Sequence, residues 1–202
     1  MGICYIVGAG EFYGSFTPLP EDLVIAADGG YDTLRARNIR ADLLLGDLDS
    51  IVCAPTDTQI IKFPKEKDET DTHLAYLEGK KRGYSVFKIY GGAGGRVDHT
   101  YANYCLLYYM RENGDFGILY DNKYISFVIK NEATRLTGKA GKGLSVFAIG
   151  GDAVGVSVIG ANYELRDGKL TQKFPLGVSN SFTDSPCDVS VEDGSLLIFQ
   201  EI

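Results

Sequence analysis

The chain has few residues of the kinds that bind zinc or form disulfides: it contains two histidines and four cysteines among 202 residues. The cysteines lie far apart and form no CxxC pair; they are Cys4, Cys53, Cys105 and Cys187. Because a structural zinc site needs clustered Cys or His ligands, this distribution argues against one. A chain of this length buries enough surface to fold without disulfide staples. We therefore expect the cysteines to be small apolar residues in a reducing compartment.

Long hydrophobic runs and an excess of positive charge are also missing. No apolar run approaches the ~20 residues that cross a bilayer, and the first residues lack the basic segment of a signal peptide. The formal net charge is −7, whereas nucleic-acid-binding domains carry clusters of Lys and Arg. These observations predict a soluble cytoplasmic protein that binds neither membranes nor nucleic acids. An anionic small molecule is still compatible, since a divalent metal reverses the local field.

Short apolar runs alternate with helical patterns over residues 1–122. The predicted strands are residues 3–7, 23–27, 43–45, 60–63, 86–90 and 116–120. The predicted helices are residues 31–38, 70–82 and 98–112. Because such alternation is typical of βαβ units, this part of the chain is predicted to form an α/β domain with a mostly parallel sheet.

The pattern changes after Asp121, where helical periodicity disappears. Short β-like runs follow at residues 124–129, 144–149, 154–159, 170–174, 188–191 and 196–199. Asp167-Gly168 and Asp193-Gly194 are dipeptides typical of hairpin turns. Closely spaced strands with such turns predict an antiparallel β-sandwich. We therefore predict two domains, an α/β domain at residues 1–122 and an all-β domain at residues 123–202.

Five aspartates follow predicted strands of the α/β domain. They are Asp28 in AADGG, Asp47 and Asp49 in GDLDS, Asp71 in KDETD, and Asp98 in GGRVDH. The carboxyl ends of parallel strands share one edge, where the ligands of α/β sheets bind. Two like charges ~4 Å apart cost about 4 kcal/mol at an effective dielectric near 20, so crowded carboxylates need a cation or raised pKa values. The pattern indicates metal-assisted chemistry, and Mg²⁺ prefers carboxylates together with water and phosphate oxygens.

Some of these residues also have an ordinary structural explanation. Asp47 and Asp49 are compatible with an Asp-rich surface turn. Thr70 can cap the helix that follows it, and Asp71 in the first turn favours the helix dipole. Capping does not explain why Lys67 stands among acids, whereas a lysine there can bind phosphate as a point charge.

The segment GGAGGRVDH, residues 91–99, joins a predicted strand to a predicted helix. Its glycines let the backbone approach a ligand closely, and the helix start offers free N–H groups to an anion. Arg96 can grip a phosphate in bidentate fashion, and Asp98 can accept a hydroxyl proton or orient the nucleophile. The alternative is a flexible loop with Asp98 as a helix cap. That alternative explains less, because Gly, Arg and Asp occur together at the edge that also carries GDLDS.

Other polar segments carry weaker signals. Gly8-Ala9-Gly10 misses the full GxGxxG pattern of dinucleotide-binding proteins. His73 is predicted to face solvent from a helix, and His99 to orient its neighbour or cap the helix; a structural role is favoured for both. The segment GVSNSF at residues 177–182 predicts an ordinary loop when it is considered alone.

Taken together, the ordered motifs resemble the thiamine pyrophosphokinase family. The matching segments are ADGG at 27–30, GDLDS at 46–50, KDETD at 67–71, GGRVDHTYAN at 94–103 and GVSN at 177–180. Each motif is weakly specific, whereas the ordered set is highly specific and spans nearly the whole chain. The resemblance implies an N-terminal α/β domain, a C-terminal β-sandwich and a homodimer. It also implies transfer of the pyrophosphoryl group of ATP to the hydroxyethyl oxygen of thiamine, giving thiamine diphosphate and AMP, with Mg²⁺.

The resemblance further implies a role for each matching residue. The implied metal ligands are Asp47, Asp49 and Asp71. Contacts to the nucleotide and its phosphates fall to Asp28, Gly29, Lys67, Thr70 and Arg96. The implied catalytic residues are Asp71, Arg96 and Asp98, the last of them near the reacting hydroxyl. Ser179, Asn180 and Tyr163 would hold thiamine across the dimer interface, so that residues 123–202 would bind thiamine and mediate dimerisation.

Three positions depart from the family's pattern. His73 stands where members often carry an acid, Ser181 where they often carry Glu, and Ala41 where proline is frequent. Ser181 lies in the thiamine segment, so this departure bears on the pocket. Two other functions stay open at this point. A metal-dependent hydrolase would release phosphate without an acceptor alcohol, and a nucleotide- or thiamine-binding module would bind its ligand without turnover.

Overall fold

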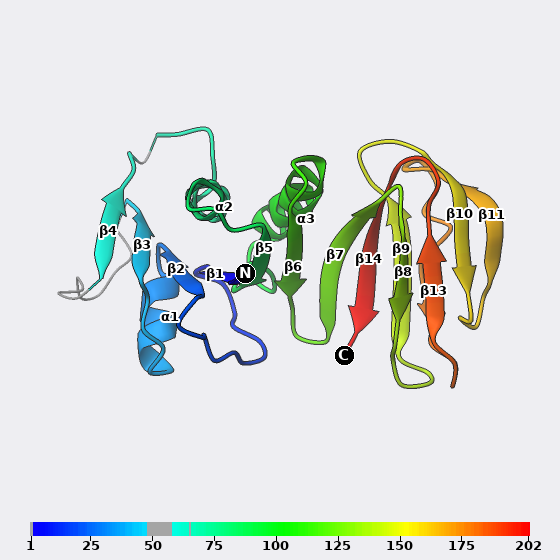
Figure 1. Cartoon of the computed structure of the whole chain (residues 1–202), viewed down its shortest axis with the longest axis horizontal. Coiled ribbons are helices and arrows are strands. Elements are labelled where there is room, and N and C mark those ends of the chain that lie inside the picture. Colours follow the sequence, from blue (N-terminus) through cyan, green and yellow to red (C-terminus); the bar gives the residue numbers. More distant parts are fainter. Residues whose placement is uncertain (1, 48–57, 65) are drawn as a thin grey trace. The chain divides into compact units, whose positions relative to one another are not determined.

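The computed structural model describes residues 2–47, 58–64 and 66–202 (Figure 1). The chain divides into two compact units. Unit 1 comprises Met1–Leu106 and Gly114–Asn122, and unit 2 comprises Leu107–Asn113 and Lys123–Ile202. Among the described residues, no helix is both long and apolar enough to cross a membrane.

Unit 1 is built on six parallel strands. They are β1 (Cys4–Val7), β2 (Leu23–Ala27), β3 (Leu43–Gly46), β4 (Gln59–Lys62), β5 (Val86–Tyr90) and β6 (Phe116–Tyr120). Their order across the sheet is β6-β5-β1-β2-β3-β4, and every neighbouring pair is parallel. Every residue of β1, β2 and β3 is buried, as expected for a parallel sheet that is covered on both faces. The predicted α/β organisation with a parallel sheet is confirmed.

Three helices accompany this sheet: α1 (Gly30–Ala36), α2 (Asp71–Lys81) and α3 (Val97–Glu112). Successive side chains of β1 point to opposite faces of the sheet. Tyr5 belongs to the core cluster that contains Leu34 of α1. Cys4 points to the other face and lies against Gly79 of α2: a Cβ added to Gly79 would stand 2.8 Å from the Cys4 sulfur. Helices α1 and α2 therefore cover opposite faces of the sheet.

The strand order places a topological switch point beside β1. The chain runs from β1 outward to β4 on one side, and it then returns to form β5 and β6 on the other side. The chain segments that follow β1 and β5 consequently lead to opposite sides of this strand pair, the first toward β2 and the second toward β6. Open α/β sheets bind their ligands in the crevice that forms at such a point.

Unit 2 contains two antiparallel sheets. The first includes β7 (Tyr124–Lys130), β9 (Gly143–Ala148), β12 (Asn180–Ser181) and β14 (Ser195–Glu201), in the order β12-β9-β14-β7. The second contains β8 (Ala133–Leu136), β10 (Ala153–Ile159), β11 (Leu165–Leu170) and β13 (Cys187–Ser190), in the order β11-β10-β13-β8. Alternate residues of β9 are buried, the pattern expected of a strand with one buried face.

Two turn predictions in this region are wrong. Asp167-Gly168 lies inside β11, where the pairing with β10 shifts register, and it does not join two strands. Asp193-Gly194 connects β13 to β14, which pair with different partners in different sheets. Aspartate followed by glycine marks a backbone that tolerates positive φ, as Asp167 has at 46° and Gly194 at 114°; bulges and other turns share this need with hairpins.

Candidate active site

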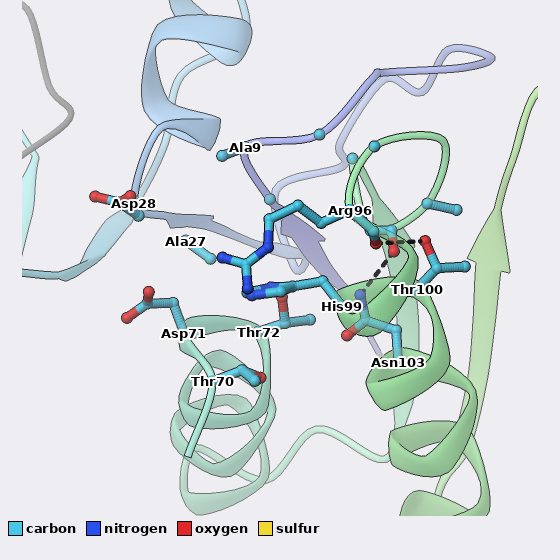
Figure 2. Close-up of a pocket in the computed structure, with 16 residues that line it drawn as sticks. Ala9, Ala27, Asp28, Thr70, Asp71, Thr72, Arg96, His99, Thr100 and Asn103 are labelled. Carbon is cyan, nitrogen blue, oxygen red and sulfur yellow. Dashed lines mark hydrogen bonds between the residues drawn. The ribbon is translucent and has the colours of Figure 1, made fainter. Parts of the chain in front are cut away.

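A cavity of about 400 Å³ lies at the carboxyl edge of the unit 1 sheet (Figure 2). Its walls come from the loops after β1 and β5, the end of β2 and the first turns of α2 and α3. We call it the unit 1 cavity, and it is lined by Gly8, Ala9, Gly10, Ala27, Asp28, Thr70, Asp71, Thr72, Gly91, Gly92, Ala93, Gly95, Arg96, His99, Thr100 and Asn103. The loops after β1 and β5 are those of the switch point. The cavity therefore occupies the position where this type of sheet binds its ligands.

The loops after β1 and β5 interlock through glycines. The Gly8 N–H donates to the carbonyl of Tyr90 at 2.8 Å, and the Gly10 N–H donates to the carbonyl of Gly91 at 2.9 Å. A Cβ at Gly8 or Gly10 would stand 2.8 or 2.6 Å from the Gly91 oxygen. Sequence reasoning discounted Gly8-Ala9-Gly10 because the dinucleotide pattern was incomplete. The overlooked signal was a pair of glycines at the end of the first strand, where loops must approach closely.

Asp28 enters the cavity from a strained backbone. Its φ is +49°, in the left-handed region, and its N–H donates to the carbonyl of Leu45 at 2.7 Å. The next two residues are glycines, and a Cβ at Gly30 would stand 1.9 Å from the carbonyl oxygen of Val7. The ADGG sequence thus lets α1 begin directly against β1. Such strain at a cavity is typical of a functional position. Gly29, the N-cap of α1, does not line the cavity.

The first turn of α2 supplies a second wall. Thr70 caps this helix, and its hydroxyl accepts the N–H of His73 at 3.2 Å. Asp71 lines the cavity and accepts a hydrogen bond from Lys67 at 2.5 Å. Lys67 does not line the unit 1 cavity, but its ammonium group binds Asp71, which does. His73 is half-buried and its Nε2 atom is shielded from solvent, so the prediction that His73 faces solvent is wrong; this burial lowers the pKa of the ring.

Arg96 and Asp98 form an exposed ion pair at the start of α3. The Arg96 guanidinium donates to both carboxylate oxygens of Asp98, at 2.6 and 3.2 Å. This hydrogen bonding lowers the pKa of Asp98 to about 2. A carboxylate with so low a pKa is a poor proton acceptor near neutral pH.

Of this segment, Arg96 and His99 line the cavity, whereas Asp98 does not. In Figure 2 the Arg96 side chain extends over the cavity toward the side on which Asp28 and Asp71 lie. Sequence reasoning gave His99 only a structural role, although it directly follows the catalytic candidate Asp98. Side-chain direction on the first helical turn decided which of the two neighbours reached the cavity.

The candidate metal ligands are brought together only in part within the described residues. Asp71 and Asp28 line the same cavity, and Asp47 follows β3, whose last residue, Gly46, lies beside Asp28. Asp49 lies outside the described residues. Within the described portion of the chain there is no group of three or more His, Cys, Asp or Glu residues arranged to hold a metal ion. Carboxylate oxygens that face a cavity still form a donor set that fits Mg²⁺, which needs only one or two protein carboxylates when phosphates and water supply the rest.

Unit 2 contains a separate cavity of about 330 Å³. We call it the unit 2 cavity, and its lining is mainly apolar: Val146, Val158, Leu165, Leu170, Leu176, Gly177 and Val178. Its polar lining residues are Tyr163, Glu164, Ser179 and Asn180. The structure therefore brings Tyr163, Ser179 and Asn180 together, although 15 residues lie between the first two in the sequence.

Hydrogen bonds hold the polar side of the unit 2 cavity. The Asn180 carboxamide accepts the N–H of Tyr163 at 2.9 Å and donates to the carbonyl of Tyr163 at 2.7 Å. Ser179 has a φ of +61°, and its N–H donates to the Ser145 hydroxyl at 3.2 Å. A mostly apolar pocket with a few fixed polar groups is typical of a small-molecule site.

Comparisons with known proteins agree with the two units. Residues 20–115 match the family model described as thiamin pyrophosphokinase, catalytic domain, and residues 128–196 match the thiamin pyrophosphokinase, vitamin B1 binding domain. A search of curated protein sequences finds no match.

Solved structures share the fold at low sequence identity. The thiamine pyrophosphokinase from Bacillus subtilis is 24% identical with a TM-score of 0.89, and 98% of each chain is covered. The enzyme from Candida albicans is 16% identical with a TM-score of 0.75, covering 100% of this chain and 88% of that chain. Yeast thiamin pyrophosphokinase is 17% identical with a TM-score of 0.71, covering 100% and 86%. Because both domain models match in order and together cover most of the sequence, the chain belongs to the thiamin pyrophosphokinase family.

Proposed function

We propose that the unit 1 cavity binds the ATP phosphates while the enzyme transfers a pyrophosphoryl group to thiamine, giving thiamine diphosphate. The transfer itself follows from the family. One observation carries the placement: the cavity at the switch point combines the first turns of two helices with Arg96 and with carboxylates. Helix starts present free N–H groups and a positive dipole end to anions, and a guanidinium binds phosphate in bidentate fashion.

The phosphate contacts are proposed for three side chains. Arg96 and Thr70 line the cavity, Arg96 with its positive charge and Thr70 at the start of α2. Lys67 forms an ion pair with Asp71, and its side chain is only 13% exposed. A lysine held this close to a carboxylate keeps a fixed position, from which it can neutralise phosphate charge. The ADGG loop, with Asp28 in the lining and Gly29 at the helix start, is proposed to face the nucleotide as well.

We propose that Asp71, Asp47 and Asp49 hold Mg²⁺, and the position of Asp28 in the same cavity makes it a further oxygen donor. A bound Mg²⁺ ion offsets phosphate charge and polarises the phosphoryl oxygens. The carboxylates of the chain then serve two purposes: they hold the cation, and they keep the lysine and arginine of the site in place.

In the proposed reaction, the hydroxyethyl oxygen of thiamine attacks the β-phosphorus of ATP. The bond from this phosphorus to the oxygen of the α-phosphate breaks, AMP leaves, and the hydroxyl proton passes to solvent or to a nearby base. Phosphoryl-type transfer depends mainly on positioning and on charge neutralisation. Asp98 is proposed to act near the reacting hydroxyl. Its low pKa beside Arg96 favours orientation of the guanidinium over proton acceptance.

The unit 2 cavity is proposed to hold thiamine through Tyr163, Ser179 and Asn180. We also propose that the two sheets of unit 2 pack as a sandwich. In support, the cavity is lined by Val146 of β9 in one sheet and by Val158 of β10 in the other.

A homodimer is proposed as well. In support, several apolar side chains of unit 2 are exposed: Tyr163 by 68%, Phe174 by 67%, Leu176 by 55% and Val178 by 53%. Three of them, Tyr163, Leu176 and Val178, line the same cavity, and contiguous exposed apolar surface marks interaction sites. Light scattering measures the oligomeric state, and a monomer at micromolar concentration would refute the dimer.

The division of labour is proposed to follow the predicted domains, with ATP and Mg²⁺ bound within residues 1–122 and thiamine within residues 123–202. The cytoplasm is the proposed location, because it supplies ATP and keeps thiols reduced. Fractionation of cells with an antibody against the chain tests this location.

Product analysis tests the reaction. The protein is incubated with ATP, Mg²⁺ and thiamine, and nucleotides and thiamine esters are separated by chromatography. AMP and thiamine diphosphate are expected in equal amounts. Formation of ADP, or release of phosphate without thiamine, would instead support a kinase of another type or a hydrolase. Ligand binding without any product would support a binding module.

Replacing Asp71 tests the metal assignment. Asp71→Asn keeps the side-chain shape but removes a charge, so we expect at least about a 100-fold fall in rate and a higher Mg²⁺ requirement. Asp152→Asn is the matched control, because Asp152 pairs with Lys169 on the surface of unit 2. Equal activity of the two variants would refute the metal role of Asp71.

A further inference from the structure

Asn103 is a buried polar residue in the wall of the unit 1 cavity. It lies within α3 and is 4% exposed. Its side-chain amide donates a hydrogen bond to the carbonyl of Gly92 at 2.7 Å (Figure 2). Asparagine is a weak helix former, and a buried amide is costly unless its hydrogen bonds are made. The residue type is therefore explained by the loop that it holds rather than by the helix that contains it.

The glycine-rich loop from Gly91 to Arg96 is fixed at both ends. At its start, the Gly91 carbonyl accepts the N–H of Gly10 at 2.9 Å. At its end, the Arg96 carbonyl accepts the N–H of Thr100 at 3.0 Å and the Thr100 hydroxyl at 3.1 Å. Between these two ends, the Gly92 carbonyl accepts the hydrogen bond from the Asn103 side chain.

Gly92 is also confined sterically. A Cβ at this position would stand 2.8 Å from Leu119 and 2.9 Å from the Asn103 amide nitrogen. A Cβ at Gly95, by contrast, would meet no described atom within 4 Å. The loop is thus confined at Gly92, and space remains around Gly95, the residue directly before Arg96.

We propose that Asn103 is a positioning residue for pyrophosphoryl transfer. By holding the Gly92 carbonyl, it sets the path of the loop, and through the loop it places the Arg96 guanidinium against the ATP phosphates. The inference depends on the proposed contact between Arg96 and the phosphates. Loss of the Asn103 hydrogen bond frees the Gly92 carbonyl and lets the loop shift while Arg96 itself stays intact.

A double-mutant cycle tests the proposal. Because a 1 Å displacement of a positioning group can cost on the order of 100-fold, Asn103→Ala should lower kcat/KM for ATP by about 10- to 100-fold. The KM for thiamine should change by less than about 2-fold, because this loop faces the phosphates. In the Arg96→Ala background, Asn103→Ala should cost almost nothing more, since the group that it positions is gone.

Asn113→Ala is the matched control. Asn113 follows the same helix, and its side-chain amide also donates to a backbone carbonyl, that of Tyr109, at 2.8 Å. It does not line the cavity. Its replacement should leave both KM values and kcat within about 2-fold of the parent. Thermal unfolding of each variant is measured alongside; should Asn103→Ala be insoluble, Asn103→Ser takes its place with the same expected outcome.

The outcomes are distinguishable. If the two losses multiply in the double variant, Asn103 acts independently of Arg96, by direct ligand contact or through stability alone, and the proposal is overturned. If Asn103→Ala has the kinetics of the parent, it is overturned as well. If Arg96→Ala retains activity, the phosphate role of Arg96 fails first, and the positioning role fails with it.

Discussion

Gly10→Ala tests the interlock between two loops that line the unit 1 cavity. Gly10 does not have a positive φ, so alanine fits its backbone conformation, and the effect is steric. The new Cβ would stand 2.6 Å from the Gly91 oxygen and 3.2 Å from the Ala93 oxygen, whereas real Cβ atoms almost never come closer than 3.0 Å. The Gly91 carbonyl must therefore retreat by at least 0.4 Å, which weakens the 2.9 Å hydrogen bond from the Gly10 N–H.

The expected cost has two parts. A weakened hydrogen bond costs about 0.5–1.5 kcal/mol, and overpacking costs about 1–3 kcal/mol, so the free energy of unfolding should fall by about 1.5–4.5 kcal/mol. Gly95→Ala in the loop after β5 is the control, because its Cβ contacts no described atom within 4 Å; we expect a change within about 0.5 kcal/mol. Urea denaturation followed by circular dichroism measures both values. Equal stability of the two variants would refute the steric argument.

Three other changes test separate parts of the molecule. Arg96→Ala should raise the pKa of Asp98 from about 2 toward the ordinary carboxyl value, because the guanidinium hydrogen bond holds it down. Because the pKa of Asp98 is lower in the folded than in the unfolded chain, the ion pair stabilises the fold above the unfolded-state pKa, and this stabilisation is lost as the pH falls through about 2. An NMR titration of the Asp98 carboxyl carbon measures the pKa in both proteins, and the same pKa in the variant and the parent would contradict the pairing. Tyr76→Phe removes a 2.7 Å hydrogen bond to the buried Asp115 carboxylate and should cost about 1–3 kcal/mol in urea denaturation, and a change below about 0.5 kcal/mol would argue against it. Ser179→Gly relieves a φ of +61° and should raise the unfolding temperature while it raises the KM for thiamine; a lower unfolding temperature with an unchanged KM would be the opposite result.

The glycines of the two cavity loops show why one of them could be singled out from the sequence and the other could not. GGAGGRVDH is predicted to be a ligand loop because glycine, arginine and aspartate occur together, and part of this segment lines the unit 1 cavity. Gly8-Ala9-Gly10 carries no charged partner, and its importance depends on Gly91, which is distant in sequence and adjacent only in the folded chain. Close backbone approach is a property of pairs of segments, so one segment cannot reveal it.

The sequence by itself determined that unit 1 contains a parallel α/β structure, that the part of unit 2 after Asn122 is formed of strands, and which family the chain belongs to. Local periodicity specifies an element, and ordered motifs specify a family, because both are written in neighbouring residues. Only the tertiary structure decided that β1 lies between β2 and β5, that β11 contains Asp167-Gly168, and that His99 lines the cavity while Asp98 pairs with Arg96 outside its lining. These outcomes depend on strand partners and side-chain directions, which are set by long-range packing rather than by any local pattern.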